Sequence, residues 1–227
     1  MTRPVIGIFG GTFNPVHVGH VRAAIEVAEA LSLAAVEFVP AARPPHKNGE
    51  PVLDFPLRLK LCRLALDGLS GFSVNTMEAD RPGPSYTRDT LASLGRARPD
   101  EDFCFILGMG DLLSLPTWKD GLRLGRLAHL AVHAREGLGL EHFGHFLAAR
   151  AADMEAAPTA DPAVWELPGG RRLTFVPVAR LDVSSSDIRD RWRCGRRIHG
   201  LVGEAVRHEL ETHAAAVTAG WSRPVPA

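Results

Sequence analysis

The stretch "FGGTFNPVHVGH" (Phe9–His20) follows directly on the apolar run "PVIGIF" (Pro4–Phe9). A short apolar run that ends in two glycines predicts a β-strand over Val5–Phe9 and a turn after it. Beyond the turn, apolar residues at helical spacing predict a helix that starts near Val18, with a face made of Val21, Ile25, Ala28 and Leu31. Two glycines, a hydroxyl, an amide, a proline and two histidines therefore lie where a strand passes into a helix.

The alternation of short apolar runs and helical patterns continues along the chain. A second apolar helical face is formed by Leu57, Leu61, Leu64 and Ala65. Further strand candidates, rich in Val, Ile, Phe and Leu, are Val36–Val39, Phe72–Met77, Phe103–Leu107, Leu127–His133 and Leu173–Val178. This pattern predicts an α/β fold in which a doubly wound parallel sheet is buried on both faces by helices.

Two segments break the alternation. Glu136–Arg171 contains prolines and glycines that predict loops around at most one helix. From Ser184 onward, "SSSDIRDRW" and "LVGEAVRHELETHA" predict two helices, so residues 183–215 form a small C-terminal helical part. Residues 1–215 are expected to form a single domain, followed by a flexible tail over residues 216–227.

Composition narrows the possible functions. The 227 residues include 26 Lys and Arg and 26 Asp and Glu, so the net charge of zero argues against bulk attraction to nucleic acid or to an anionic membrane. Three separated cysteines, Cys62, Cys104 and Cys194, give neither a disulfide framework nor a zinc pattern, and a reducing cytoplasm is the simplest compartment. No signal peptide and no run of about 18 apolar residues is found, which predicts a soluble cytoplasmic protein.

The opening motif is suited to phosphate binding. In a doubly wound sheet, ligands bind outside the carboxyl ends of the strands, where Gly10, Gly11 and Thr12 fall. Glycines let the backbone approach a ligand closely, and the helix N-terminus attracts anions. His17 and His20 are three residues apart and share one face of the first helical turn. Taken alone, "GG" is often only a turn, and a His pair more often lies on the surface or in the core than in a catalytic site. Neither G-x-G-x-x-G nor G-x-x-x-x-G-K-[ST] occurs here.

"GGTFNPVHVGH" resembles the signature of the nucleotidyltransferase superfamily that carries an H-x-G-H motif. The second signature of its adenylyltransferases, I-S-S-T-x-I-R, is similar to "VSSSDIR" at Val183–Arg189, with Ser186 where Thr is usual. The resemblance implies a Rossmann-like fold, catalytic contacts from His17 and His20, and release of pyrophosphate. The ATP-binding residues that it implies are Gly10, Gly11, Thr12, Phe13, Ser184, Ser185, Ile188 and Arg189. Without the resemblance, "SSSD" is simply a good helix cap.

Three further stretches, "PPHK" (Pro44–Lys47), "GPSYTRDTL" (Gly83–Leu91) and "LPTWKD" (Leu115–Asp120), resemble bacterial nicotinate-nucleotide adenylyltransferases in this order. The resemblance runs from about Val5 to about Leu210. It implies transfer of the adenylyl group of ATP, with Mg²⁺, to nicotinate mononucleotide, giving deamido-NAD. Such an enzyme is expected to be a monomer or homodimer that binds neither nucleic acid nor membrane.

The resemblance implies that the mononucleotide is bound by Lys47, Thr87, Asp111, Trp118 and Arg135. Trp118 can stack on a pyridine ring, Thr87 and nearby amides can hold a carboxylate, and Lys47 can add positive charge over phosphates. Each has a plainer interpretation: a core tryptophan, a capped turn and a solvated lysine.

The sequence departs from the family pattern in several places. Asn14 stands where Asp is commoner, and Gly110 occupies the position of the family's G-x-D acid, with Asp111 one residue later. The family's R-P-G is represented by "REG", which keeps Arg135 and loses the proline.

The reaction expected is direct in-line attack of the 5′-phosphate on the α-phosphorus of ATP, which needs no nucleophilic Ser or Cys. Two other functions remain open: adenylyl transfer to nicotinamide mononucleotide or another phosphate acceptor, and a catalytically impaired nucleotide-binding sensor. A His-based metal protein is disfavoured because no third ligand lies at suitable spacing from His17 and His20.

Overall fold

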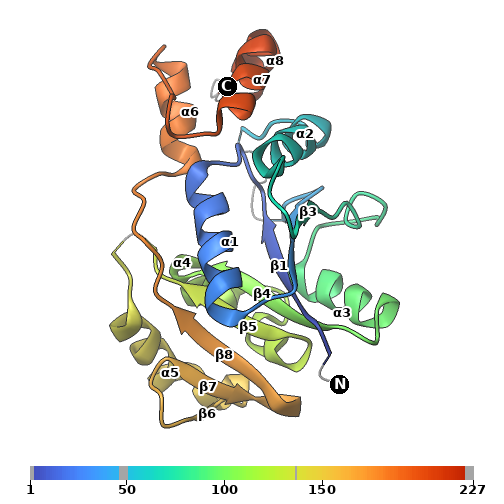
Figure 1. Cartoon of the computed structure of the whole chain (residues 1–227), viewed down its shortest axis with the longest axis vertical. Helices are drawn as coiled ribbons and strands as arrows, with labels where there is room; N and C mark the ends of the chain where they lie inside the picture. Colours follow the sequence, from blue (N-terminus) through green and yellow to red (C-terminus); the bar gives the residue numbers. More distant parts are fainter. Residues whose placement is uncertain (1–2, 46–50, 136, 223–227) are drawn as a thin grey trace. The chain divides into compact units, whose positions relative to one another are not determined.

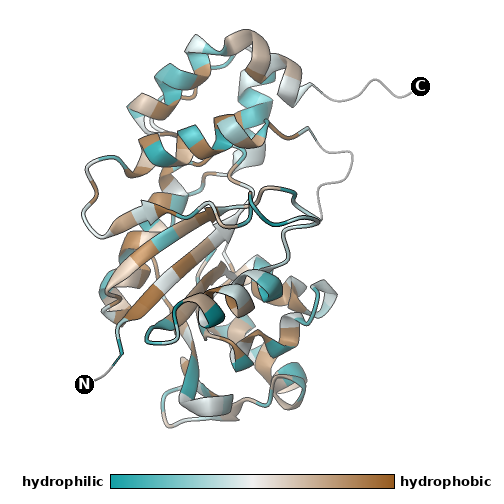
Figure 2. Cartoon of the chain, turned by 90° about the vertical axis from the view of Figure 1, so that its right-hand side faces the viewer, coloured by the Kyte–Doolittle hydropathy of each residue, from teal (hydrophilic) through white to brown (hydrophobic). Residues whose placement is uncertain are grey.

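The computed structural model describes residues 3–45, 51–135 and 137–222. Within these residues the strands are β1 (Val5–Gly11), β2 (Ala35–Pro40), β3 (Phe72–Val74), β4 (Asp102–Gly108), β5 (His129–His133), β6 (Ala157–Pro158), β7 (Val164–Leu167) and β8 (Arg171–Val176). They form one eight-stranded sheet in the order β3-β2-β1-β4-β5-β8-β7-β6. Figure 2 shows hydrophobic stretches along strands of the sheet, and β1 and β4 at its centre are mostly buried, as expected of parallel strands covered on both faces.

Helices connect and follow these strands (Figure 1). The α-helices are α1 (Val18–Leu31), α2 (Phe55–Leu66), α3 (Thr87–Ala97), α4 (Met109–Ser114), α5 (Leu140–Met154), α6 (Ser185–Arg193), α7 (Glu204–Thr212) and α8 (Ala214–Trp221). Short 3₁₀ turns are η1 (Leu115–Thr117), η2 (Gly121–Arg126) and η3 (Pro168–Gly170).

The centre of the sheet is parallel. Strand β1 pairs with β4 from Val5 opposite Asp102 to Phe9 opposite Ile106, β4 pairs with β5, and β5 pairs with β8, all in parallel. The predicted α/β fold with a doubly wound parallel sheet is therefore confirmed. Each of the six predicted strands is present, although β3 ends at Val74 and not at Met77. The Asn75 side chain accepts a hydrogen bond from the Met77 amide at 2.9 Å, and this local turn ends the strand.

The expectation for residues 136–171 is partly wrong. The one helix is present as α5, but the segment also contains β6 and β7, which were not predicted. They extend the sheet as antiparallel strands, with Val164 of β7 opposite Thr174 of β8. Of the four β7 residues, two are half-buried, one is exposed and one is buried, so the segment lacks the continuous buried apolar run that identifies the central strands.

The C-terminal part contains three helices where two were predicted. Helix α8 continues to Trp221, so the prediction of a flexible tail from residue 216 onward is wrong for residues 216–221. Val217 and Trp221, one helical turn apart, are both completely buried, and this explains why the segment folds. Residues 223–227 lie outside the described residues. Figure 1 shows α6, α7 and α8 gathered together, with α2 packed against α7.

The described residues divide into two compact units. The first unit comprises residues 3–10, 23–37 and 86–180, and the second comprises residues 11–22, 38–85 and 181–222. The single domain over residues 1–215 stays a prediction. No helix in the described part of the chain is long and apolar enough to cross a membrane.

Candidate active site

The end of β1 and the turn after it are built from residues that allow close packing, and the strand continues through Gly10 and Gly11, two residues beyond its predicted end at Phe9. A Cβ atom on Gly10 would lie 3.2 Å from the Phe105 ring, and one on Gly11 would lie 3.0 Å from the Phe13 ring. Phe13 is buried and stacks on Phe38 with ring centroids 5.3 Å apart. Its edge also meets the His20 ring at 5.1 Å, so Phe13 supports a histidine of the signature from within the second unit.

His17 and His20 bind each other through two reciprocal hydrogen bonds. The His17 amide donates to His20 Nδ1 at 3.1 Å, and the His20 amide donates to His17 Nδ1 at 3.3 Å. The rings are stacked with centroids 3.6 Å apart. Because each Nδ1 accepts a hydrogen bond, this network assigns the proton of each neutral ring to Nε2. The pair can therefore offer two Nε2–H donors, as oxygens of a phosphate group require.

Gly19 lies between the two histidines because a side chain would not fit there. A Cβ atom at this position would lie 2.8 Å from Cγ1 of Val183 and 3.1 Å from Nδ1 of His17. The amides at the start of α1 are partly engaged, since Val18 donates to the Leu201 carbonyl at 3.1 Å and His20 donates to His17.

The loop before His17 is anchored by buried polar groups. Arg58, which is 2% exposed, donates from Nη1 to the Thr12 carbonyl at 2.8 Å and from Nε to the Leu53 carbonyl at 2.9 Å. Asn14 donates from Nδ2 to the Pro51 carbonyl at 2.9 Å. Sequence reasoning missed Arg58, because an arginine in an amphipathic helix is usually solvated.

The second signature lies against the same loop, within the second unit. Ser185 Oγ donates to the Pro15 carbonyl at 2.8 Å, and Arg189 Nη1 donates to the Asn14 carbonyl at 2.9 Å. Ser184 Oγ accepts from the Asp187 amide at 3.1 Å as the N-cap of α6, and Ile188 is buried. The structure thus brings the two signatures together.

Asp111 and Arg135, both predicted to contact the mononucleotide, lie close together at the carboxyl ends of β4 and β5. A Cβ atom on Gly108 would lie 3.4 Å from Cδ of Arg135, 3.5 Å from Cε1 of His133 and 3.6 Å from Oδ2 of Asp111. The Gly108 amide also donates to Asp111 Oδ2 at 3.3 Å, so the displaced carboxylate caps α4. His133 was not predicted, although a histidine that ends an apolar strand is a signal that could have identified it.

The environment of His133 favours its neutral form. Burial lowers the pKa of this imidazole, and the nearby Arg135 lowers it further. The Ala134 carbonyl, 3.1 Å from Nδ1, and the Asp111 carboxylate act in the opposite direction. A neutral imidazole beside a carboxylate and a guanidinium can bind hydroxyl groups of a substrate.

Thr87 and Trp118 belong to segments that are tied together in the first unit. Lys119 Nζ lies 2.8 Å from Asp89 Oδ2 and 4.9 Å from the centre of the Tyr86 ring, so it links the turn after η1 to the start of α3. Trp118 is half-buried, with its ring centroid 6.4 Å from that of Phe105. Lys47, also predicted to contact the substrate, lies outside the described residues.

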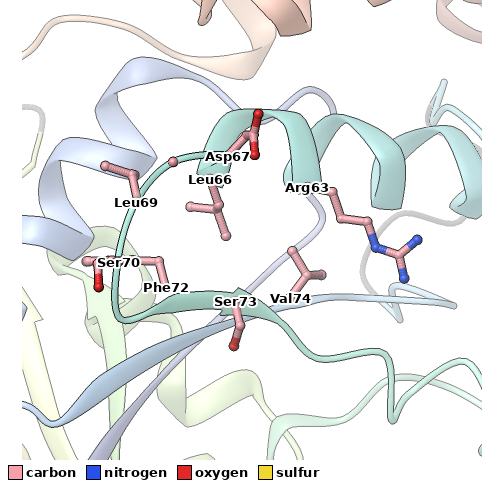
Figure 3. A pocket seen from close by; sticks show the side chains of 9 residues that line it. Arg63, Leu66, Asp67, Leu69, Ser70, Phe72, Ser73 and Val74 are labelled. Atoms are coloured by element: carbon pink, nitrogen blue, oxygen red, sulfur yellow. The ribbon is translucent and has the colours of Figure 1, made fainter.

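A pocket of about 510 Å³ lies elsewhere, at the turn between α2 and β3 (Figure 3). Its lining comes from residues 63–74, including Arg63, Leu66, Asp67 and Phe72. No predicted site residue lines this pocket. It is a surface feature of one turn and not the candidate active site.

Comparison with known proteins identifies the class. The model of the cytidylyltransferase-like family matches residues 8–191, so the chain is a nucleotidyltransferase of the cytidylyltransferase-like class. Curated relatives named probable nicotinate-nucleotide adenylyltransferase include those of Methylococcus capsulatus (39% identical, covering 89% of this chain and 94% of that protein) and Thermus thermophilus (38% identical, 92% and 97%). The chain belongs to the nicotinate-nucleotide adenylyltransferase family.

Solved structures agree on the fold. The nicotinic acid mononucleotide adenylyltransferase of Plasmodium falciparum, complexed with NaAD, gives a TM-score of 0.70 at 15% identity and covers 94% of this chain and 97% of its own. A putative nicotinate-nucleotide adenylyltransferase of Vibrio parahaemolyticus gives 0.62 at 19% identity, covering 94% and 96%. The Rossmann-like fold expected from the sequence is confirmed.

Proposed function

We propose that this chain transfers the adenylyl group of ATP to nicotinate mononucleotide, releasing pyrophosphate and giving deamido-NAD. The observation that carries the proposal is the reciprocal pairing of His17 and His20 beside the loop that Ser185 and Arg189 hold. The two signatures converge within one unit, as the binding of one triphosphate by both of them requires.

Two imidazole Nε2–H donors give the proposed site its chemistry. The 5′-phosphate oxygen of the acceptor attacks the α-phosphorus of ATP in line, the bond to the bridging oxygen breaks, and pyrophosphate leaves. His17 and His20 donate to the phosphate oxygens on which negative charge develops, and His20 is the main contributor. Donors held before the reaction stabilise this charge without reorganisation, and loss of one such donor typically costs about 10²–10³ in rate.

Mg²⁺ is expected to accompany ATP. The described residues contain no group of three or more His, Cys, Asp or Glu side chains that could hold a metal ion. In phosphoryl-transfer enzymes Mg²⁺ is commonly held by substrate phosphates and water with only one or two carboxylates of the protein. We propose the same arrangement here. When bound, Mg²⁺ would neutralise charge on the leaving pyrophosphate.

Thr87, Asp111, Trp118 and Arg135 of the first unit are the residues proposed to bind the acceptor; Lys47, also part of the proposal, lies outside the described residues. The names of the relatives support nicotinate mononucleotide as the acceptor. The half-buried Trp118 ring is suited to stacking on a pyridine. In the same proposal the enzyme works in the cytoplasm as a monomer or homodimer.

The test is pyrophosphate release from MgATP with nicotinate mononucleotide, measured beside nicotinamide mononucleotide. We expect a large preference in kcat/KM for the acid. An equal or reversed preference would replace the acceptor, and no turnover with either, from folded protein that still binds ATP, would favour the nucleotide-binding sensor.

His20→Ala tests the catalytic assignment, because it removes an Nε2–H donor together with the Nδ1 atom that accepts from the His17 amide. We expect kcat to fall about 10²–10³-fold with the fold preserved. His208→Ala, which changes an exposed histidine on α7 of the same unit, is the matched control and should keep full activity. A His20→Ala enzyme within tenfold of wild type would contradict the assignment.

A further inference from the structure

We infer that Trp221 is a positioning residue: the last residue of α8 holds the Asn14 side chain, and through it the loop that leads to His17, in the geometry that adenylyl transfer needs. The inference rests on the proposed function. It concerns a residue at the far end of the chain, 207 positions from its partner.

Asn14 is the point at which four segments of the second unit meet. Its Oδ1 accepts from the Trp221 indole N–H at 2.9 Å and from the Leu53 amide at 3.1 Å, while its Nδ2 donates to the Pro51 carbonyl at 2.9 Å. Its own carbonyl accepts from Arg189 at 2.9 Å. The side chain is 5% exposed, and two donors on one side with a carbonyl on the other fix the orientation of its amide.

Trp221 has little freedom to move. It is completely buried, and its ring meets the Trp192 ring edge-on at 5.7 Å. Its carbonyl accepts from Arg193 Nε at 2.7 Å. The preceding residue, Gly220, lets α8 approach the 51–53 segment, because a Cβ atom there would lie 2.9 Å from Cδ2 of Leu53. The indole N–H therefore reaches Asn14 from a rigid support.

Only Pro15 and Val16 separate Asn14 from His17. Val16 is completely buried, and the Pro15 carbonyl is held by Ser185, so a shift at Asn14 passes along a short and constrained backbone. The His17 amide is itself the donor to His20 Nδ1. Misplacement of a reacting group by about 1 Å can cost on the order of 10²-fold in rate, so a smaller shift at this hub should cost about tenfold.

Trp221→Phe removes the indole N–H and keeps an aromatic ring. The matched control is Trp192→Phe, because Trp192 belongs to the same ring pair and its Nε1 donates at 3.0 Å to Thr218 Oγ1, not to the loop. We expect Trp221→Phe to lower kcat about tenfold and Trp192→Phe to stay within twofold of wild type. Equal kcat values in the two variants, whatever their melting temperatures, would reduce Trp221 to a core residue and overturn the inference.

Two further measurements separate positioning from simple packing. Hydrogen exchange of the amides in the 12–17 loop should be faster in Trp221→Phe than in Trp192→Phe. In an Asn14→Ala background, Trp221→Phe should lower kcat no further, because the acceptor is already gone. Unchanged loop exchange, or a full tenfold loss in that background, would contradict the inference.

If Trp221→Phe does not fold, benzothienylalanine at position 221 replaces the N–H by sulfur and retains the shape of the indole. The same fall in kcat and the same faster loop exchange are expected. If the wild-type protein releases no pyrophosphate with either mononucleotide, the proposed function is refuted. Hydrogen exchange of the amides in the 12–17 loop would still test the role of Trp221.

Discussion

Arg58 provides a direct test of how the 12–17 loop is anchored. The residue is 2% exposed, and its guanidinium joins the Thr12 carbonyl, at 2.8 Å, to the Leu53 carbonyl, at 2.9 Å. Arg58→Met retains most of the aliphatic side chain and removes both hydrogen bonds. Two carbonyls that the folded chain satisfies with a cation are then left without that donor.

The magnitude follows from two opposing contributions. Each hydrogen bond from a charged donor stabilises the fold by about 1.5–3 kcal/mol, so the two together contribute about 3–6 kcal/mol. Burial lowers the pKa of the Arg58 guanidinium, and the carboxylates of Asp54 and Glu78 oppose this shift only in part. Because methionine is uncharged, the variant avoids the free-energy cost of burying a cation. We therefore expect the free energy of unfolding to fall by about 2–4 kcal/mol in total. For a chain of this size, 1 kcal/mol corresponds to about 2–4 °C in Tm, giving a fall of about 5–15 °C.

Calorimetry of Arg58→Met beside Arg63→Met provides the assay. Arg63 is exposed on the same helix, and its variant should melt within about 2 °C of wild type. At temperatures where the protein stays folded, Arg58→Met should also show faster exchange of the loop amides. An Arg58→Met protein that melts with wild type would refute the idea that this cation anchors the loop.

Two other variants test the first unit. Since burial lowers the pKa of His133, the unfolded chain takes up the proton first on acidification; the stabilisation is therefore complete above about pH 6.5 and is lost as the pH falls through the folded-state pKa. His133→Gln should flatten the fall in urea midpoint between pH 7.5 and 5.5, and a slope unchanged from wild type would contradict this. Gly121→Ala should lower Tm and raise KM for the mononucleotide more than for ATP, because a methyl group would collide with the preceding turn and lie 2.9 Å from Cβ of Trp118. If the ratio of the KM for the mononucleotide to the KM for ATP equals that of wild type, this turn has no part in binding the mononucleotide.

The parts of the fold that sequence could predict are those with local signals. The central strands were identified because each is an apolar run, and the passage from strand to helix because Gly10 and Gly11, which end β1 in the structure, come after the apolar residues. Strands β6 and β7 were not predicted because they are only two and four residues long, β6 is exposed and a single β7 residue is buried, so neither carries a recognisable periodicity. Helix α8 was read as a tail because "AAAVTAGW" has only two residues that become buried, Val217 and Trp221.

For the candidate site too, only the residues that stand in local sequence motifs could be predicted. His17, His20 and Arg189 could be named because they stand in short motifs. The residues that hold them could not, since the contacts of Arg58 with Thr12 and of Trp221 with Asn14 join positions 46 and 207 residues apart. No periodicity or spacing encodes a hydrogen bond of that range. The reciprocal bonds of the two histidines likewise depend on ring orientation, which the letters do not specify.

The order of the strands has a consequence for the behaviour of the protein at high concentration. The sheet ends in β3 on one side and β6 on the other, which are only three and two residues long. Pro158, in β6, has no amide hydrogen to donate. Long edge strands with free donors are templates on which a second chain can add, leading to aggregation, and both ends of this sheet are too short to serve as one. The longer parallel strands β1, β4 and β5 lie inside the sheet, where both of their edges are already paired.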